Sequence, residues 1–270
     1  MGAITLLMAG LCACAEIDLK KIVALSTLSQ LGVMAVALSL ALKGLRFFHL
    51  ITHALFKALL FLCVGVGIHT VYGTQDMRRY RGLPQTLAWP SAFMCRANLS
   101  LLGFPFLAGY YSKDRILEGI YNLGARTFSL RVFLLGVGLT AAYSLKMVYL
   151  LLGAPGTSHP ANLNAGGTAA TVKIPLLGLG LGSVLGGVLL GCGLEARAPM
   201  LTAVDKLAPL ILILAGGMVG GRERRPKSSL FRCIWDLTPT SQSLAGWRPG
   251  MRGPLVLDEG AGETLGGPGG

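Results

Sequence analysis

Charged residues are the scarcest feature of this sequence. Only 13% of its 270 residues are Asp, Glu, Lys or Arg, about half the share found in an ordinary soluble domain. Long segments contain no charge at all, and short breaks that are basic or rich in Gly and Pro separate them. This pattern excludes a soluble globular fold for most of the chain. It predicts an all-α protein whose helices cross a membrane several times.

Acidic residues are scarcer than basic ones, with 12 Asp and Glu against 24 Lys and Arg, a formal net charge of +12. Such an excess is typical of proteins that bind nucleic acid or an anionic surface. The basic residues gather in the predicted loops and after Gly221, and no basic face alternates with aromatic residues. We therefore interpret the charge as complementary to a lipid bilayer and expect no nucleic-acid partner.

Cysteines with the spacing of a metal site are also lacking. Five of the six cysteines lie within apolar segments, where free cysteine behaves as a small hydrophobic residue: Cys12, Cys14, Cys63, Cys95 and Cys192. The sequence therefore favours neither a disulfide framework nor a cysteine metal site.

Apolar segments of about the 20 residues that a bilayer requires recur along the chain. They are predicted at residues 2–15 (a partial span), 22–42, 46–71, 85–123, 127–153, 173–194 and 200–220. A signal peptide normally carries Lys or Arg before its apolar run, and the first segment has neither. We therefore interpret it as the end of a helix whose beginning is absent. We predict a bundle of about six to seven spans over residues 1–220. A polar, Gly- and Pro-rich tail, disordered in isolation, is expected over residues 221–270.

Counting the crossings places residues 16–21, 72–84, 154–172 and the tail on one side of the membrane. That side carries more Lys and Arg than the other, which favours the cytoplasm or the mitochondrial matrix.

Three basic residues share one stripe of a helix inside the span at 46–71. His49, His53 and Lys57 follow one another at intervals of four, which places them on the same helical face. Removal from water disfavours the charged form of such groups, so they can exchange protons. The alternatives are satisfied core histidines with a lysine that reaches the interface, and a metal site, which the lysine ammonium disfavours. Three basic groups together favour proton transfer.

A second polar group follows a break in the span at 85–123. Gly103, a proline and Gly109 interrupt the helix just before Lys113 and Asp114. A broken helix at membrane depth is tolerated only inside protein or beside water, and it often marks an ion path. Lys113 is a candidate proton carrier and Asp114 a charge that tunes it, whereas a structural surface turn is the alternative. The apolar segment continues past Glu118, an accessory candidate, which argues against a surface position.

A third polar group opens the span at 22–42. Lys20 lies among the charged residues at the start of this span. The alternative interpretation of these charges is a helix cap in contact with water. Ser26, Ser29 and Gln30 follow within the span, where they can bond to neighbouring helices or line a wet path. We include Lys20 in the proton path, with Ser26 and Ser29 as accessory candidates.

Together these motifs resemble the chain 5 family of NADH–ubiquinone oxidoreductase, the distal antiporter-like subunits of respiratory complex I. Their order and spacing match over roughly residues 1–150. The resemblance is carried by four segments: Asp18 to Gly32, His49 to Lys57, Gln75-Asp-Met-Arg78 and Gly109-Tyr-Tyr-Ser-Lys-Asp114. The segment from Phe231 to Pro239 resembles the one after the second helix bundle in mitochondrial members.

The resemblance implies a proton-translocating subunit in the mitochondrial inner membrane that binds no cofactor itself. The complex as a whole would use NADH, FMN, iron–sulfur clusters and ubiquinone. Its other membrane subunits would be the partners, and a separate chain or missing segment would supply the first helix bundle. The positions of Lys20, His49, His53 and Lys57 would belong to the central polar axis. The position of Lys113, beside Asp114, would lead toward the exit of protons to the intermembrane space.

The sequence departs from the family pattern at several points. The chain begins part-way through the pattern and ends where a long lateral helix is expected. Arg96 lies in a span that the family keeps apolar and needs a partner, and Lys146 stands where arginine is expected. Two other functions stay open from the residues: a subunit of a multi-subunit cation/proton antiporter, and an inactive structural fragment.

Overall fold

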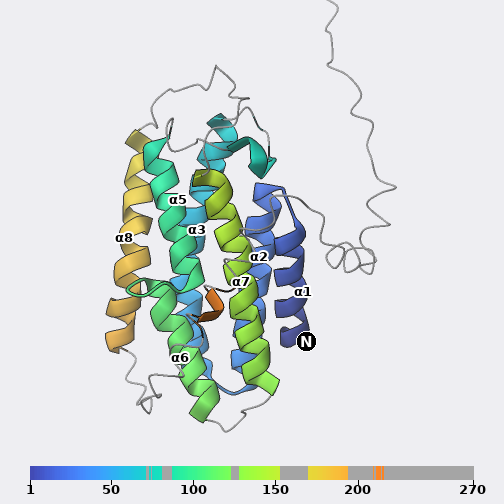
Figure 1. Ribbon diagram of the computed structural model, residues 1–270. Coiled ribbons are helices and arrows are strands. Elements are labelled where there is room, and N and C mark those ends of the chain that lie inside the picture. Colours follow the sequence, from blue (N-terminus) through green and yellow to red (C-terminus); the bar gives the residue numbers. More distant parts are fainter. Residues whose placement is uncertain are drawn as a thin grey trace, which may run out of the picture. The chain divides into compact units, whose positions relative to one another are not determined.

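The protein is a bundle of helices in the computed structural model (Figure 1). The structure describes residues 1–70, 73, 75–80, 87–122, 128–152, 170–193, 209, 211–213 and 215, and this part contains helices but no strand. The predicted all-α class is confirmed. The predicted tail at 221–270 and most of the span at 200–220 lie outside the described residues.

Eight helical elements follow one another in the described part. They are α1 (Gly2–Ala15), α2 (Leu19–Ser39), α3 (Lys43–Thr70), the 3-10 helix η1 (Met77–Tyr80), α5 (Ala88–Leu102), α6 (Ala108–Asn122), α7 (Phe128–Leu152) and α8 (Ala170–Gly193). The bounds of α1, α2, α3, α7 and α8 agree with predicted spans to within a few residues, because length and apolar character set both, whereas η1 lies in the predicted loop at 72–84.

Four described helices are long and apolar enough to cross a membrane: Leu19–Ser39, Lys43–Thr70, Phe128–Leu150 and Val172–Gly191. α1 is shorter, with 14 residues. α8 leaves large apolar side chains such as Ile174, Leu181 and Leu189 exposed. Outward-facing apolar side chains are what lipid or a membrane partner would cover.

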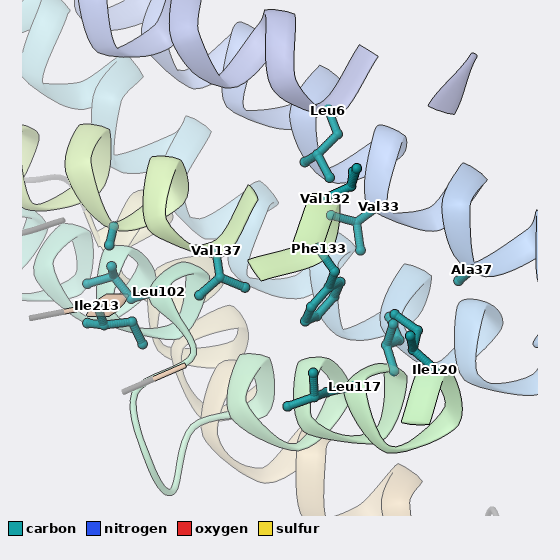
Figure 2. Close-up of a cluster of buried hydrophobic side chains, with 12 residues drawn as sticks. Leu6, Val33, Ala37, Leu102, Leu117, Ile120, Val132, Phe133, Val137 and Ile213 are labelled. Carbon is teal, nitrogen blue, oxygen red and sulfur yellow. The ribbon is translucent and has the colours of Figure 1, made fainter. Parts of the chain in front are cut away.

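α1 packs against α2 and α7, and these helices share an apolar core with α6. Figure 2 shows Leu6 of α1 pointing toward Val33 of α2 and the neighbouring Val132 and Phe133 of α7. All four side chains are buried. This core holds the helices against each other on one side, while α3 contacts α2, α5, α6 and α8 on the other.

The predicted long span at 85–123 is broken into α5 and α6. Gly103 closes α5 in the left-handed conformation with φ 86°, which glycine adopts without a Cβ penalty. Phe106, also at positive φ (69°), turns the chain into α6. The break therefore has a local backbone cause, as the glycines and proline of this segment predict.

The two halves of the broken span approach each other closely at Gly109. A Cβ at this position would collide with the backbone carbonyl of Ser100. The amide of Gly109 also donates to Ser100 Oγ at 3.4 Å. Only glycine allows this contact between the end of α5 and the first turn of α6.

The segment after α3 returns to the start of α2. The amide of Leu19 donates to the carbonyl of Gln75 at 2.9 Å, and that of Met77 to Ile17 at 3.2 Å. The two segments therefore lie at the same end of the bundle, in agreement with the predicted sidedness. Lys21 and Asp18 form an exposed ion pair at 2.9 Å there.

Candidate functional site

The three basic residues of α3 lie on one buried face, as their spacing predicts. His49 is 0% exposed, His53 7% and Lys57 3%. The imidazole rings are 6.0 Å apart between centroids. A helix brings residues four apart onto the same face, and packing against α2, α5, α6 and α8 removes that face from the surface.

Lys57 ends among oxygen atoms of α2. Its ammonium donates to the backbone carbonyl of Val23 at 3.2 Å and to Ser26 Oγ. The Ser26 hydroxyl also bonds to the Val23 carbonyl, at 2.8 Å. Both acceptors are uncharged, so they orient the lysine without holding it in one protonation state as a carboxylate would.

His49 connects α3 to α6. Its Nδ1 lies 2.9 Å from Ser112 Oγ, and the same hydroxyl bonds to the carbonyl of Gly109 at 3.3 Å. The serine can therefore donate to or accept from the imidazole, according to its tautomer. Ser112 precedes Lys113 in the sequence, so this contact carries the histidine stripe onto the broken helix.

Lys113 reaches back across the break. Its ammonium donates to the carbonyl of Leu101, near the end of α5, where helical carbonyls have lost their usual partners. The lysine stem packs over Gly103, because a Cβ added there would lie 3.4 Å from Lys113 Cδ, an ordinary contact distance. The αL turn at Gly103 thus shapes both the break and the path of the lysine.

A cavity of about 30 Å³ opens beside the break, lined among others by Gly103, Tyr110, Lys113 and Asp114. One water molecule needs roughly 10–15 Å³, so the cavity has room for one or two. Lys113 therefore faces a space large enough for water, to which Asp114 of its own helix also contributes.

We call these buried residues the polar row: Lys57, His53, His49, Ser112 and Lys113. Within it the rings of His53 and His49 lie 6.0 Å apart between centroids, and His49 contacts Ser112. Every member can accept or release a proton, or hold a partner that does. Among the described residues, no group of three or more His, Cys, Asp or Glu could hold a metal ion. The arrangement suits proton transfer between two lysines on different helices.

The remaining candidates of the sequence analysis do not all lie next to the polar row. Ser26 joins the polar row through Lys57. Ser29 points to α1, where its hydroxyl bonds to the carbonyl of Leu6 at 3.2 Å. Glu118 is buried on α6, with Arg115 Nε 3.9 Å from its carboxylate. Lys20 lies exposed in the first turn of α2, so the structure does not bring it into the polar row.

Sequence reasoning missed Ser112 as a site residue. It stands next to Lys113 in the sequence, but adjacent residues of a helix point in different directions, so only the packing of α6 on α3 pairs it with His49. One sequence signal was available: Ser112 follows Gly109 by three residues, so the two lie on the same face of α6. Small residues on one face allow a neighbouring helix to approach.

Both residues that depart from the family pattern have partners. The guanidinium carbon of Arg96 lies 5.7 Å from the centroid of the Phe93 ring, one turn earlier on α5, a favourable cation–π geometry. The ammonium of Lys146 donates to the carbonyls of Cys14 at 2.6 Å and Glu16 at 3.2 Å. It therefore caps the end of α1 from α7.

Apolar helices, a buried polar row and a helix break at its end define a multi-pass membrane protein with an internal polar path. The chain belongs to the NADH:quinone oxidoreductase/Mrp antiporter transmembrane family, whose model matches residues 1–140. The resemblance inferred from the motifs is thereby confirmed.

Curated relatives carry the name NADH-ubiquinone oxidoreductase chain 5. NADH-ubiquinone oxidoreductase chain 5 of Anopheles gambiae is 41% identical over 225 residues, which is 82% of this chain and 38% of the relative. The same protein of Lumbricus terrestris is 36% identical over 254 residues, 88% of this chain and 44% of the relative. The chain therefore spans less than half the length of these relatives.

Solved structures share the fold. Respiratory complex I from Thermus thermophilus with bound Aureothin contains a chain with a TM-score of 0.53 and 25% identity, covering 70% of this chain and 43% of that one. The Mrp complex from Dietzia sp. DQ12-45-1b gives a TM-score of 0.58 at 19% identity, covering 82% and 47%. The second likeness supports the fold alone.

Proposed function

We propose that this chain forms a proton-translocating part of an NADH:ubiquinone oxidoreductase. The observation that carries the proposal is the polar row, a buried series of titratable groups between Lys57 and Lys113. The identity to chain 5 relatives supports this assignment over a cation/proton antiporter subunit or an inactive fragment.

In this proposal the chain performs no redox chemistry. Electron transfer from NADH to ubiquinone, through FMN and iron–sulfur clusters, takes place elsewhere in the complex. The chain lies in the mitochondrial inner membrane, contacts other membrane subunits, and is complemented by a first helix bundle from a separate chain or from further sequence.

Proton movement along the row starts from a protonated lysine. A neutral His53 or His49 accepts a proton at one ring nitrogen and releases another from the opposite nitrogen. Ser112 passes it toward Lys113 by exchanging its hydroxyl proton. Moving one charge against the membrane potential costs about 2.3 kcal/mol per 100 mV. The electrostatic interaction of two unit charges a few ångström apart in a protein is of that order.

The test replaces Lys57 or Lys113 by Met in the assembled complex and measures NADH-driven proton uptake in proteoliposomes. Met keeps the length and apolar stem but cannot carry a proton, so uptake should fall at least about tenfold, as when a proton-transfer group is lost. Lys43→Met, at the exposed start of α3, is the matched control and should pump normally.

Two outcomes would overturn the proposal. Normal pumping by both buried-lysine variants, with normal assembly, would make the chain a structural component. Purification of the chain in a complex that exchanges cations for protons but does not oxidise NADH would assign it to the antiporter class.

A further inference from the structure

Two basic side chains on neighbouring helices, Arg96 of α5 and Lys173 of α8, lie outside the polar row. Both are exposed, and neither has an ion-pair partner among the described residues. Residues 81–87 and 153–169, which precede the two helices, contain no Asp or Glu. Cationic groups within transmembrane segments are costly and almost always pair with another group. The described part of the chain does not supply an anion for these two.

α5 and α8 lie side by side (Figure 1). Gly180 of α8 packs against the ring of Phe93 in α5, and Gly187 packs against Ala108 at the start of α6. The contacts of α8 therefore advance from α5 to α6 along the chain, so α8 runs in the same direction as α5. Because residues 72–84 and 154–172 precede the two helices, both begin at the end of the bundle predicted to face the cytoplasm or matrix.

The exposed side chains of the two helices lie on one outer face. With about 100° of rotation per residue, Trp89 and Arg96 lie about 40° and 60° to one side of Phe93. Leu181 lies about 100° to the other side of Gly180. In parallel helices that touch at Phe93 and Gly180, these opposite rotations lead to the same side of the pair. We call this surface the α5–α8 outer face, and its exposed residues are Trp89, Arg96, Lys173, Leu177 and Leu181.

The two charges lie near one surface of the membrane. Trp89, 52% exposed in the first turn of α5, is of the residue type that marks the level of the lipid headgroups. Arg96 follows it by seven residues, about 10 Å along the helix. Its guanidinium carbon lies 5.7 Å from the ring centroid of Phe93, one turn closer to the helix start, so the charge turns back toward the headgroups. Lys173 lies in the first turn of α8.

We propose that the α5–α8 outer face binds an anionic phospholipid from the leaflet on the cytoplasmic or matrix side. The guanidinium of Arg96 donates two parallel hydrogen bonds to phosphate oxygens, a geometry that its planar fork suits. The Lys173 ammonium adds a second positive charge. The acyl chains lie along Leu177 and Leu181, which are exposed. None of these residues belongs to the polar row, so the inference is independent of the proposed proton transfer.

The depth of the charges favours a lipid over a protein partner. Phosphate groups already occupy the headgroup level, whereas a neighbouring transmembrane helix would have to carry a costly carboxylate within its span. Net charge then selects the class of lipid. The ammonium group of phosphatidylcholine offsets its own phosphate, whereas phosphatidylglycerol keeps a negative charge that basic residues attract.

The test is photolabelling of the assembled complex in nanodiscs. The probes are phosphatidylglycerol and phosphatidylcholine that carry the same acyl chain with a diazirine group. The readout is the amount of lipid adduct on α8 peptides, measured by mass spectrometry. One basic residue near the membrane surface favours an anionic lipid about fivefold, so phosphatidylglycerol should label α8 at least about fivefold more than phosphatidylcholine does.

Substitutions assign this excess to the proposed residues at equal amounts of assembled complex. Arg96→Leu and Lys173→Leu should each reduce the excess severalfold, and the double variant should abolish it. Arg96→Lys keeps the charge and should retain part of the excess. Arg131→Leu is the matched control, because Arg131 is an exposed arginine in the first turn of α7, at the opposite end of the bundle. Its loss should leave the excess unchanged.

Three results would overturn the inference. Equal labelling by the two lipids would show that this face contacts lipid without recognising the headgroup. No adduct on α8 from either lipid would show that another subunit covers the face. An excess that survives in the double variant would place the anionic lipid at other residues.

Discussion

At the scale of single residues, the two buried lysines share an arrangement. Lys57 and Lys113 both donate to neutral oxygen atoms, a serine hydroxyl and backbone carbonyls, on neighbouring helices. A buried ion pair would hold its lysine charged and would resist proton loss. Neutral acceptors orient the ammonium and leave its proton exchangeable, which is the physical requirement for a relay.

Ser112 is the residue on which the link between α3 and α6 depends. Ser112→Ala removes the hydroxyl that lies 2.9 Å from His49 Nδ1, so proton uptake by the assembled complex should fall severalfold. The stability cost should be only about 1 kcal/mol, the usual value for one hydrogen bond. Ser183→Ala provides a matched loss of a buried hydroxyl on α8. Equal uptake by the two variants would remove Ser112 from the relay.

At the scale of elements, the break between α5 and α6 determines where Lys113 points. A continuous helix would carry the lysine away from the carbonyl of Leu101, because each residue turns the helix by about 100°. The turn at Gly103 and the close approach at Gly109 fix the second half in its own direction. The chemistry of this segment therefore depends on two glycines that carry no functional group.

Alanine substitution at three glycines separates these contributions. Gly109→Ala would overlap the Ser100 backbone and should destabilise the protein by about 1–3 kcal/mol. Gly103→Ala meets ordinary contact distances but is strained by its positive φ, for about 1–2 kcal/mol. Gly65→Ala, with no described atom within 4 Å of the added Cβ, should be neutral or up to about 1 kcal/mol stabilising in its helix.

Thermal unfolding of the purified complex measures these three effects. The expected order of melting temperatures places Gly65→Ala highest and Gly109→Ala lowest. A Gly109→Ala variant that melts like the unmodified complex would show that α5 and α6 separate at this point without cost.

At the scale of the whole bundle, α2 and α3 run in opposite directions (Figure 1). Lys20, at the start of α2, and Lys43, at the start of α3, are both exposed and stand at opposite ends of the bundle. Only the first lies beside residues 75–77, at the end predicted to face the cytoplasm or matrix.

This arrangement predicts the sidedness of labelling by a membrane-impermeant maleimide. Lys20→Cys should react from the cytoplasmic or matrix side and Lys43→Cys from the opposite side, because α2 crosses the membrane between them. The unmodified protein is the control for its own cysteines, of which Cys14 and Cys63 are buried. Labelling of both variants from one side would contradict the topology.

Much of this protein is set by local sequence patterns. The lengths of the apolar segments determine the helices, because a bilayer fixes the number of residues per crossing. The spacing of four between His49, His53 and Lys57 determines their common face. The glycines and proline after residue 102 determine the break. Each of these depends on residues near one another in the chain, so a pattern is enough.

The partners of the polar groups were decided only by the tertiary structure. Which face of α2 meets α3 determines that Ser26 contacts Lys57 while Ser29 turns to α1. The packing of α6 on α3 selects Ser112 for His49, and that of α7 on α2 selects Thr140 for Gln30. Lys20 stays exposed because it faces away from the packed side of α2, on which Leu19 and Ile22 are buried. Such pairs join residues far apart in the chain, and they depend on how helices rotate and pack against each other, which no local spacing specifies.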